Sequence, residues 1–311
     1  MLKVLFIGGY GRSGSTLLDR VLGQVPGFLS VGELRHVFEE GFLENRRCGC
    51  GTRFRECGFW RAVTVRAFGP LERAEVDEMA ALKRRVDRWW KAPLLGWRLG
   101  TPRARREVGA YREVLRRLYA AIAAESGARV LIDSSKDVSH GYALRGLEDS
   151  LDLHVLHLVR DPRAVAFSWQ RKKFNPGADE PMNRYSLLRT SAEWTAINAL
   201  TRFHRRSGAR YASLRYGDFA ADPEAAVEGV LGFLGEPDRP NPVAPDRTVH
   251  LAADHTAAGN PNRFRRGEVA IRPDEEWRRS MSPAGRLLVG ALTLPGLRRY
   301  TRPDPRRVRA R

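Results

Sequence analysis

The chain has 311 residues, of which 42% are hydrophobic and 9% aromatic. This apolar content is enough for a sizeable core and excludes a disordered chain. The 54 Lys and Arg residues outnumber the 36 Asp and Glu residues, and a formal net charge of +18 predicts an anionic partner: a nucleotide, an acidic sugar, nucleic acid or a membrane surface. The apolar run at residues 1–7 is too short for a signal peptide or a membrane span, so we expect a soluble, cytoplasmic protein.

The chain opens with a pattern typical of strand, turn and helix. Leu2 to Ile7 form a short apolar run that ends in glycines, which suits a buried parallel strand. After the glycines, apolar residues recur at helical spacing between Leu17 and Leu22, which predicts a helix. The next stretch, residues 34–107, looks irregular, and its part from about residue 40 to 107 is expected to be a variable insert.

The rest of the chain alternates between the two kinds of element. Helices are expected around 111–122, from Pro162, within 183–206 and over 223–234, and strands at 130–132, 153–159 and 211–214. Strands that alternate with helices predict an α/β fold, a P-loop-like parallel β-sheet flanked by helices on both faces. We expect one domain over 1–311, with a basic C-terminal extension at about 282–311.

The turn after the first predicted strand is rich in glycine and reads GGYGRSGSTLL. Gly9 and Gly14 have the spacing of a Walker A loop, but Ser15 stands where that loop has its Lys. A helix N-terminus after such a turn still favours anion binding, because backbone N–H groups and the helix dipole face the ligand. The cation lies earlier, at Arg12, whose planar fork suits phosphate or sulfuryl oxygens.

The RSGST core of this turn resembles the 5′-phosphosulfate loop of sulfotransferases that use 3′-phosphoadenosine 5′-phosphosulfate (PAPS). The similarity is to the branch that contains tyrosylprotein sulfotransferases and many bacterial enzymes. The resemblance implies that Arg12 contacts the donor sulfate. It also implies that the 5′-phosphate is held by Ser13, Gly14, Ser15, Thr16 and Leu17.

Three later segments extend the resemblance. LVRDPRAVAFSW resembles the family's 3′-phosphate motif, which assigns that phosphate to Arg160 and Ser168. RYGDFAADP resembles a segment whose Tyr, here Tyr216, touches the adenine side. GNPNRFRRG resembles a late basic loop that closes on the nucleotide. Its matching residues are Arg265, Arg266 and Gly267.

Sulfuryl transfer to a hydroxyl group needs a base for the proton and positive charge at the leaving phosphate. By resemblance to the tyrosylprotein branch, Glu33 is the base, and Lys136 supports the leaving group after the second predicted strand. His36 is the alternative base, because cytosolic sulfotransferases use a His on a different segment. No metal is needed for this chemistry.

Cys48, Cys50 and Cys57 resemble a Cys-rich segment common in bacterial members of the family. Their spacing is suggestive of a metal site, but the sequence reveals no fourth ligand, so we expect buried thiols or one disulfide and no metal. A Trp-rich run follows, with three readings open: an acceptor pocket, a membrane contact or a core patch. The run contains Trp89, Trp90 and Trp97.

Two alternative functions remain at this point. A P-loop nucleotide kinase or ATPase would share the first strand, loop and helix, with Asp133 as the one Walker-B candidate. A nucleic-acid-binding protein rests on charge alone, because no known binding motif is present, and nucleic acid is therefore not an expected partner. Under the preferred reading the partners are a nucleotide donor and a hydroxyl acceptor: a carbohydrate, a small metabolite or tyrosine. Peripheral membrane contact and oligomeric state stay open.

Overall fold

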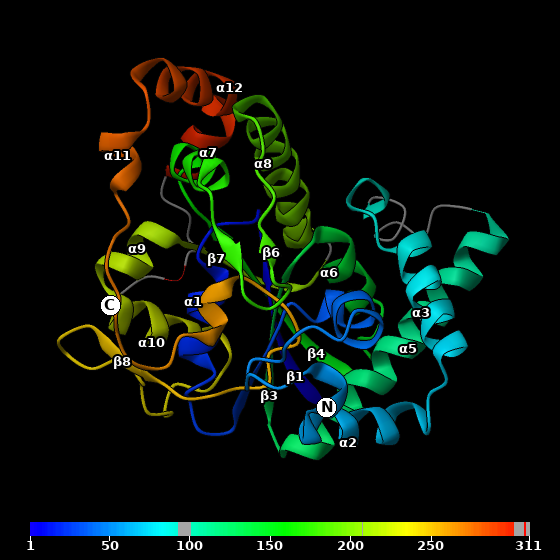
Figure 1. Ribbon diagram of the computed structural model, residues 1–311. Helices are drawn as coiled ribbons and strands as arrows, with labels where there is room; N and C mark the ends of the chain where they lie inside the picture. The colour runs from blue at the N-terminus through cyan, green and yellow to red at the C-terminus, as the bar shows by residue number, and fades with distance from the viewer. Residues whose placement is uncertain (93–100, 207, 302–307, 309–311) are drawn as a thin grey trace.

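The computed structural model describes residues 1–92, 101–206, 208–301 and 308, and Figure 1 traces the chain. The strands are β1 (Leu2–Gly8), β2 (Phe28–Gly32), β3 (Val130–Lys136), β4 (Leu151–Val159), β5 (Phe174–Asn175), β6 (Glu180–Pro181), β7 (Arg210–Arg215), β8 (Thr248–Leu251) and β9 (Gly267–Ala270). The α-helices are α1 (Ser15–Leu22), α2 (Gly58–Phe68), α3 (Arg73–Val86), α5 (Pro102–Ser126), α6 (Val138–Arg145), α7 (Pro162–Gln170), α8 (Leu187–Arg202), α9 (Tyr216–Ala221), α10 (Pro223–Phe233), α11 (Glu276–Ser280) and α12 (Pro283–Thr301).

Five parallel strands form the central sheet in the order β2-β3-β1-β4-β7. Strand β1 lies in the middle and pairs with β3 on one side and β4 on the other. The chain therefore reverses its direction of winding beside β1. In open α/β sheets, ligands bind at such a point, outside the carboxyl ends of the strands.

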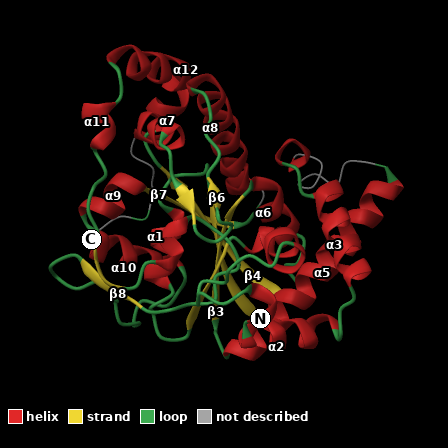
Figure 2. Ribbon diagram, viewed as in Figure 1, coloured by secondary structure: helices red, strands yellow, loops and turns green. Residues whose placement is uncertain are grey.

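Helices cover both faces of the sheet, as Figure 2 shows. The side chains of β1 alternate: Val4 and Phe6 pack into one apolar cluster with α2, α3, α5 and α6, whereas Leu5 and Ile7 pack into a second cluster with α1, α9 and α10. All four side chains are fully buried. A strand that is apolar on both faces belongs to a sheet covered on both sides, so the predicted fold class is confirmed.

The expectation of irregular structure over 34–107 was wrong, because α2 and α3 lie there. Half of the residues of helix α3 are charged, and it buries few apolar side chains, among them Val76 and Val86, so its apolar stripe is weak. The sequence signal for this helix lies at its N-terminus, where Glu72 and Glu75 form a capping box. Strand β2 was also missed. It has five residues and lies at the edge of the sheet, so it pairs on one side only.

Much of the expected C-terminal extension is a packed helix. Helix α12 lies against α7 and α8. A Cβ atom at Gly296 would lie 2.7 Å from the Trp194 ring, and the Tyr300 hydroxyl donates to the Asn198 carbonyl over 3.0 Å. Across the described residues, no helix combines the length and the apolar character that crossing a membrane requires.

Candidate active site

A cavity of about 630 Å³ opens at the carboxyl end of the sheet, beside the glycine-rich loop between β1 and α1. Its wall brings together residues from the first 33 positions with residues more than 240 positions later. The predicted site residues that line it are Arg12, Gly14, Ser15, Thr16, Leu17, Glu33, Lys136, Arg160, Ser168 and Tyr216. Ser13 is not part of the lining: it is 2% exposed, and its hydroxyl has no hydrogen-bond partner among the described residues.

The loop between β1 and α1 depends on backbone conformations that glycine adopts most readily. Gly9 has φ +133°, and a Cβ atom there would lie 2.4 Å from the Leu158 carbonyl oxygen. Gly14 has φ +90° and caps α1, which begins at Ser15. The first N–H groups of a helix have no partner within the helix. Since Ser15 and its neighbours line the cavity, this end of α1 favours an anion there.

Arg12 is held in the left-handed region of backbone space, with φ +66°. Its guanidinium lies over the Trp169 ring at 4.6 Å from the centroid, and its Nη2 is 3.3 Å from the Met182 sulfur. Its Nε and Nη1 are buried and have no partner among the described residues. Burial lowers the pKa of Arg12. A buried cation with unused donors beside a cavity suits an anionic ligand.

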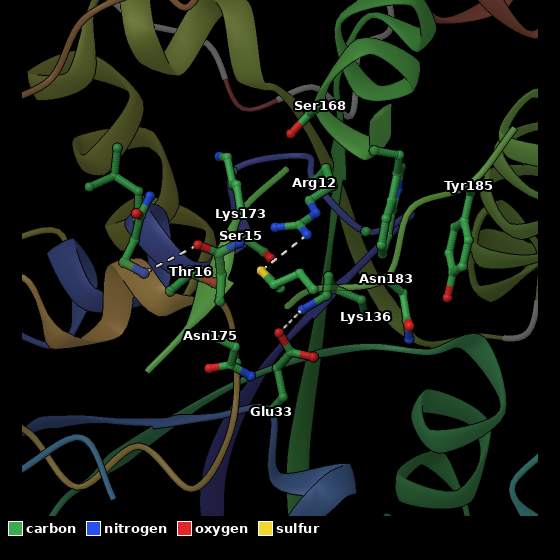
Figure 3. Close-up of a pocket in the computed structure, with 18 of the residues that line it drawn as sticks. Arg12, Ser15, Thr16, Glu33, Lys136, Ser168, Lys173, Asn175, Asn183 and Tyr185 are labelled. Atoms are coloured by element: carbon green, nitrogen blue, oxygen red, sulfur yellow. Dashed lines mark hydrogen bonds and ion pairs between the residues drawn. The ribbon is translucent and has the colours of Figure 1, made fainter. Parts of the chain in front are cut away.

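Glu33 and Lys136 form an ion pair in the same wall. Glu33 follows β2 and Lys136 ends β3, and the Oε1 and Nζ atoms are 2.5 Å apart. Lys136 has φ +65°, a conformation that is uncommon for a residue with a side chain and is often found at functional sites. In Figure 3 the two side chains point toward one another, Arg12 lies beside Lys136, and Ser168 lies across the cavity from Glu33.

His36, the alternative base, lies behind Glu33 and is not part of the cavity wall. Its Nε2 is 3.8 Å from Glu33 Oε2, and its Nδ1 is 3.7 Å from Glu40 Oε1. Burial, reinforced by nearby cations such as Arg35, holds the pKa of His36 well below its usual value, so the ring is neutral at pH 7.

Glu40 lines the cavity and was not predicted. It belongs to a π-helical segment, Val37–Leu43. Burial raises the pKa of Glu40 to about 7, against a lowering effect of Arg46 at 3.5 Å. π-Helical turns frequently occur at functional sites, but this one has no sequence signal as clear as a glycine-rich loop.

Arg160, which directly follows β4, and Ser168, in the last turn of α7, converge on the cavity. The Arg160 guanidinium lies over the Tyr216 ring at 4.6 Å, and Tyr216 in turn packs on Gly14, where a Cβ atom would meet the ring at 2.4 Å. In this structure Arg160 Nη2 donates to Asp274 over 2.9 Å. Asp274 also lines the cavity and was not predicted.

The three residues predicted from the late basic loop do not line the cavity. The Arg265 carbonyl accepts a hydrogen bond from Arg20, Arg266 Nη2 donates to the Cys50 carbonyl over 2.7 Å, and Gly267 begins β9. The same loop reaches the cavity a few residues earlier. The residues that do so are Gly259, Asn260 and Asn262.

A further wall comes from the segment after α7, which sequence reasoning left unassigned. It includes the short hairpin of β5 and β6. Burial lowers the pKa of Lys173 on this segment, and nearby Arg12 adds to the effect. Its cavity-lining residues are Lys173, Asn175, Glu180, Pro181, Met182, Asn183 and Tyr185, beside Trp169 of α7.

The Trp-rich run lies away from the cavity where it is described. Trp89 packs against the apolar cluster that contains α2 and α5, and Trp90 is 56% exposed beside Arg88. Trp97 lies outside the described residues. The core-patch reading therefore fits Trp89.

Asp133, the Walker-B candidate, is fully buried in a network of hydrogen bonds. Its carboxylate accepts from the Ser135 N–H at 2.8 Å, lies 3.0 Å from His140 Nε2 and bonds to Tyr119. Although burial opposes it, His140 with these hydrogen bonds lowers the pKa of Asp133. A carboxylate enclosed in this way supports β3 and does not face the cavity.

The sequence model of the sulfotransferase family matches residues 5–240. The chain belongs to the sulfotransferase family. The match spans the phosphate loop, Glu33, Lys136 and the segment from Arg160 to Tyr216. No curated protein sequence is similar enough to count as a match.

Solved structures of sulfotransferases share the fold. The sulfotransferase domain of the olefin synthase from Synechococcus PCC 7002 is 21% identical, with a TM-score of 0.52 over 98% of this chain and 95% of that one. The sulfotransferase domain from the curacin biosynthetic pathway is 16% identical, with a TM-score of 0.50 over 94% of this chain and 97% of that one. At these identities the likeness shows the fold, and a sulfotransferase implies a sulfate donor and an acceptor.

Proposed function

We propose that this sulfotransferase uses PAPS as its donor and transfers the sulfuryl group to a hydroxyl acceptor. The observation that carries the proposal is the convergence of three groups on one cavity: the Arg12 loop, the Arg160–Ser168 pair and the Glu33–Lys136 pair. The three groups are far apart in the sequence, and the parallel strands bring them together at the carboxyl edge of the sheet.

The donor fits the cavity with its two charged ends on separate anchors. The 5′-phosphosulfate lies at the N-terminus of α1, where residues 13–17 and Arg12 supply N–H groups and a cation. The 3′-phosphate lies between Arg160 and Ser168, and Tyr216 contacts the adenine side. An Arg at a strand end and a hydroxyl two helical turns later can both bond one dianion.

The reaction follows from the placement of Glu33 and Lys136. The acceptor oxygen forms a bond to sulfur as the bond between sulfur and the bridging phosphate oxygen breaks, and 3′,5′-phosphoadenosine leaves. Glu33 takes the hydroxyl proton, and Lys136 and Arg12 stabilise the charge that develops on the bridging oxygen. These two cations supply the positive charge that Mg²⁺ supplies in kinases.

The acceptor enters from the side of the hairpin. Figure 3 shows Asn183 and Tyr185 on the opposite side of Arg12 and Lys136 from Ser15 and Thr16. With the donor phosphate at Ser15 and Thr16, an acceptor on the Asn183 side would lie across Arg12 and Lys136 from that phosphate. An amide and a phenol there suit a hydroxylated acceptor, such as a carbohydrate, a small metabolite or tyrosine.

A screen with labelled PAPS tests the proposal. The purified protein is given sugar, phenol and tyrosine-peptide acceptors without added Mg²⁺, and we expect transfer of label to at least one class. Nucleotide preference is measured beside it by melting temperature. Stabilisation by Mg²⁺-ATP but not by metal-free 3′,5′-phosphoadenosine would favour the kinase reading and contradict the proposal.

A further inference from the structure

The three cysteines meet a histidine that is distant in the sequence. Cys48, Cys50, Cys57 and His255 each direct one ligand atom to a common point, and these atoms all lie within 4.8 Å of one another. His255 is 198 residues from Cys57, which explains why the sequence revealed no fourth ligand. The reason for expecting no metal therefore does not hold.

Three of the separations are close to the edges of a zinc tetrahedron. Bonds of about 2.3 Å to sulfur and about 2.0 Å to nitrogen give S–S edges of about 3.8 Å and S–N edges of about 3.5 Å. The Sγ atoms of Cys50 and Cys57 are 3.8 Å apart, and His255 Nδ1 is 3.3 Å from Cys57 Sγ and 3.8 Å from Cys48 Sγ. A disulfide would need about 2.0 Å between sulfurs. All three cysteines are free.

Backbone and aromatic groups surround the four side chains. The N–H groups of Cys50 and Thr52 donate to the sulfurs of Cys48 and Cys50, and the turn closes with the Gly51 N–H on the Cys48 carbonyl at 2.8 Å. The His255 ring is stacked on Phe59 at 4.8 Å, and its carbonyl accepts from Trp60 Nε1 at 2.9 Å.

Cations surround the same turn. Arg266 Nη2 donates to the Cys50 carbonyl at 2.7 Å, and Arg47 Nη1 donates to the Gly51 carbonyl at 3.2 Å. Three thiolates with Zn²⁺ and a neutral imidazole carry a net charge of −1. The two guanidiniums on this turn have the sign that offsets this charge.

We propose that Cys48, Cys50, Cys57 and His255 bind one structural Zn²⁺ ion. The site has four protein ligands and no open position, so the ion fastens two segments together and takes no part in sulfuryl transfer. One segment is residues 47–57, and the other is the loop that contains His255.

The loop fastened in this way supports the active site. The Asp254 carboxylate pairs with Arg20 of α1 at 2.7 Å, and the Ala258 carbonyl accepts from the Glu33 N–H at 3.0 Å. Gly259 and Asn260 then line the cavity. Loss of the ion should therefore loosen the wall beside Glu33 as well as lower stability.

Metal analysis of the reduced, full-length protein tests the site. Purified without chelators, the protein should contain one zinc per chain. His255→Gln and Cys57→Ser should contain less than a tenth of that amount. The matched control is His250→Gln, which changes an exposed histidine five positions away, in β8, and should keep full zinc.

Cobalt and chelator measurements keep the test decisive if a variant does not fold. Co²⁺ added to chelator-treated wild-type protein should give the absorption of tetrahedral, thiolate-bound cobalt, and zinc removal should lower the melting temperature by roughly 5 °C or more. Wild-type protein that binds neither metal after reduction, a Cys50–Cys57 disulfide in mass spectrometry, or full zinc in His255→Gln would each overturn the proposal.

Discussion

Arg160 Nη1 donates a hydrogen bond to the backbone carbonyl of Arg12 across 3.0 Å. The two residues follow the neighbouring strands β4 and β1, and the carbonyl belongs to the residue that holds the left-handed φ of +66°. The cation proposed for the 3′-phosphate thus also supports the loop proposed for the 5′-phosphosulfate. The two ends of the donor site are joined through the protein before any donor arrives.

This bond separates the expected effects of two substitutions. Ser168 reaches the cavity without supporting the loop. Ser168→Ala should therefore weaken the binding of 3′,5′-phosphoadenosine by about 0.5–1.5 kcal/mol and leave the binding of adenosine 5′-phosphosulfate unchanged. Arg160→Ala should weaken the binding of 3′,5′-phosphoadenosine by about 1.5–3 kcal/mol. It should also weaken the binding of adenosine 5′-phosphosulfate, because the loop loses its support. Calorimetric titration of both ligands measures the split. Equal loss of both ligands in Ser168→Ala would show that this residue only maintains the fold.

A second prediction concerns Asp274, whose carboxylate forms an ion pair with the Arg160 guanidinium at 2.9 Å. A 3′-phosphate has to replace this carboxylate or share the guanidinium with it. Asp274→Asn should therefore raise the affinity for 3′,5′-phosphoadenosine by roughly two- to fivefold at low salt, with a smaller increase at high salt. Weaker binding in Asp274→Asn would mean that the carboxylate positions Arg160 for the ligand.

The third prediction concerns the base. Glu33→Gln preserves the shape of the side chain but removes proton acceptance, so turnover should fall by roughly 10²- to 10⁴-fold with little change in donor affinity. His36→Gln, behind the cavity wall, should have a mild effect. A nitrophenol that is already ionised at the assay pH should restore much of the turnover of Glu33→Gln.

The same pair of variants can reverse the assignment. Near-normal turnover in Glu33→Gln beside an inactive His36→Gln would make His36 the base. Donor affinity serves as the control in both cases, because neither variant should change the phosphate loop.

Glu40 gives a prediction about pH. Its pKa of about 7 lies above the usual value of a Glu, so the folded state favours the protonated form, and this contribution to stability is lost as pH rises through 7. The free energy of unfolding of Glu40→Gln, relative to that of the wild type, should therefore rise by on the order of 1–2 kcal/mol between pH 5 and pH 8.5. Urea unfolding measures it. Glu44→Gln, a more exposed neighbour that also pairs with Arg46, should show no such gain. A pH-independent difference for Glu40→Gln would contradict the shift.

The strands that consist of an apolar run, and the loops after them, could be predicted from the sequence. A strand that is buried on both faces is restricted to apolar residues, which makes it easy to recognise. That is why β1, β3, β4 and β7 were found with small errors at their ends. The edge strand β2 and the charged helix α3 escaped, because β2 is only five residues long and the apolar stripe of α3 is sparse.

The site divides in the same way. Lys136 ends β3, and Arg12 and Arg160 follow β1 and β4, where the chain must turn at one edge of the sheet, so their meeting could be predicted. The contribution of His255 and Asp274 could not, because loops from the last quarter of the chain fold back over distances that no local pattern encodes.

The position of β1 in the centre of the sheet also determines when the protein can fold. Residues 2–8 leave the ribosome well before residues 130–136 and 151–159, which are their partners in the sheet. At a synthesis rate of about 5–20 residues per second, this apolar strand stays unpaired for roughly 6–25 s. Both of its edges are open during that time, which exposes the nascent chain to aggregation. We therefore expect chaperones to bind β1 on the growing chain until β3 has been made.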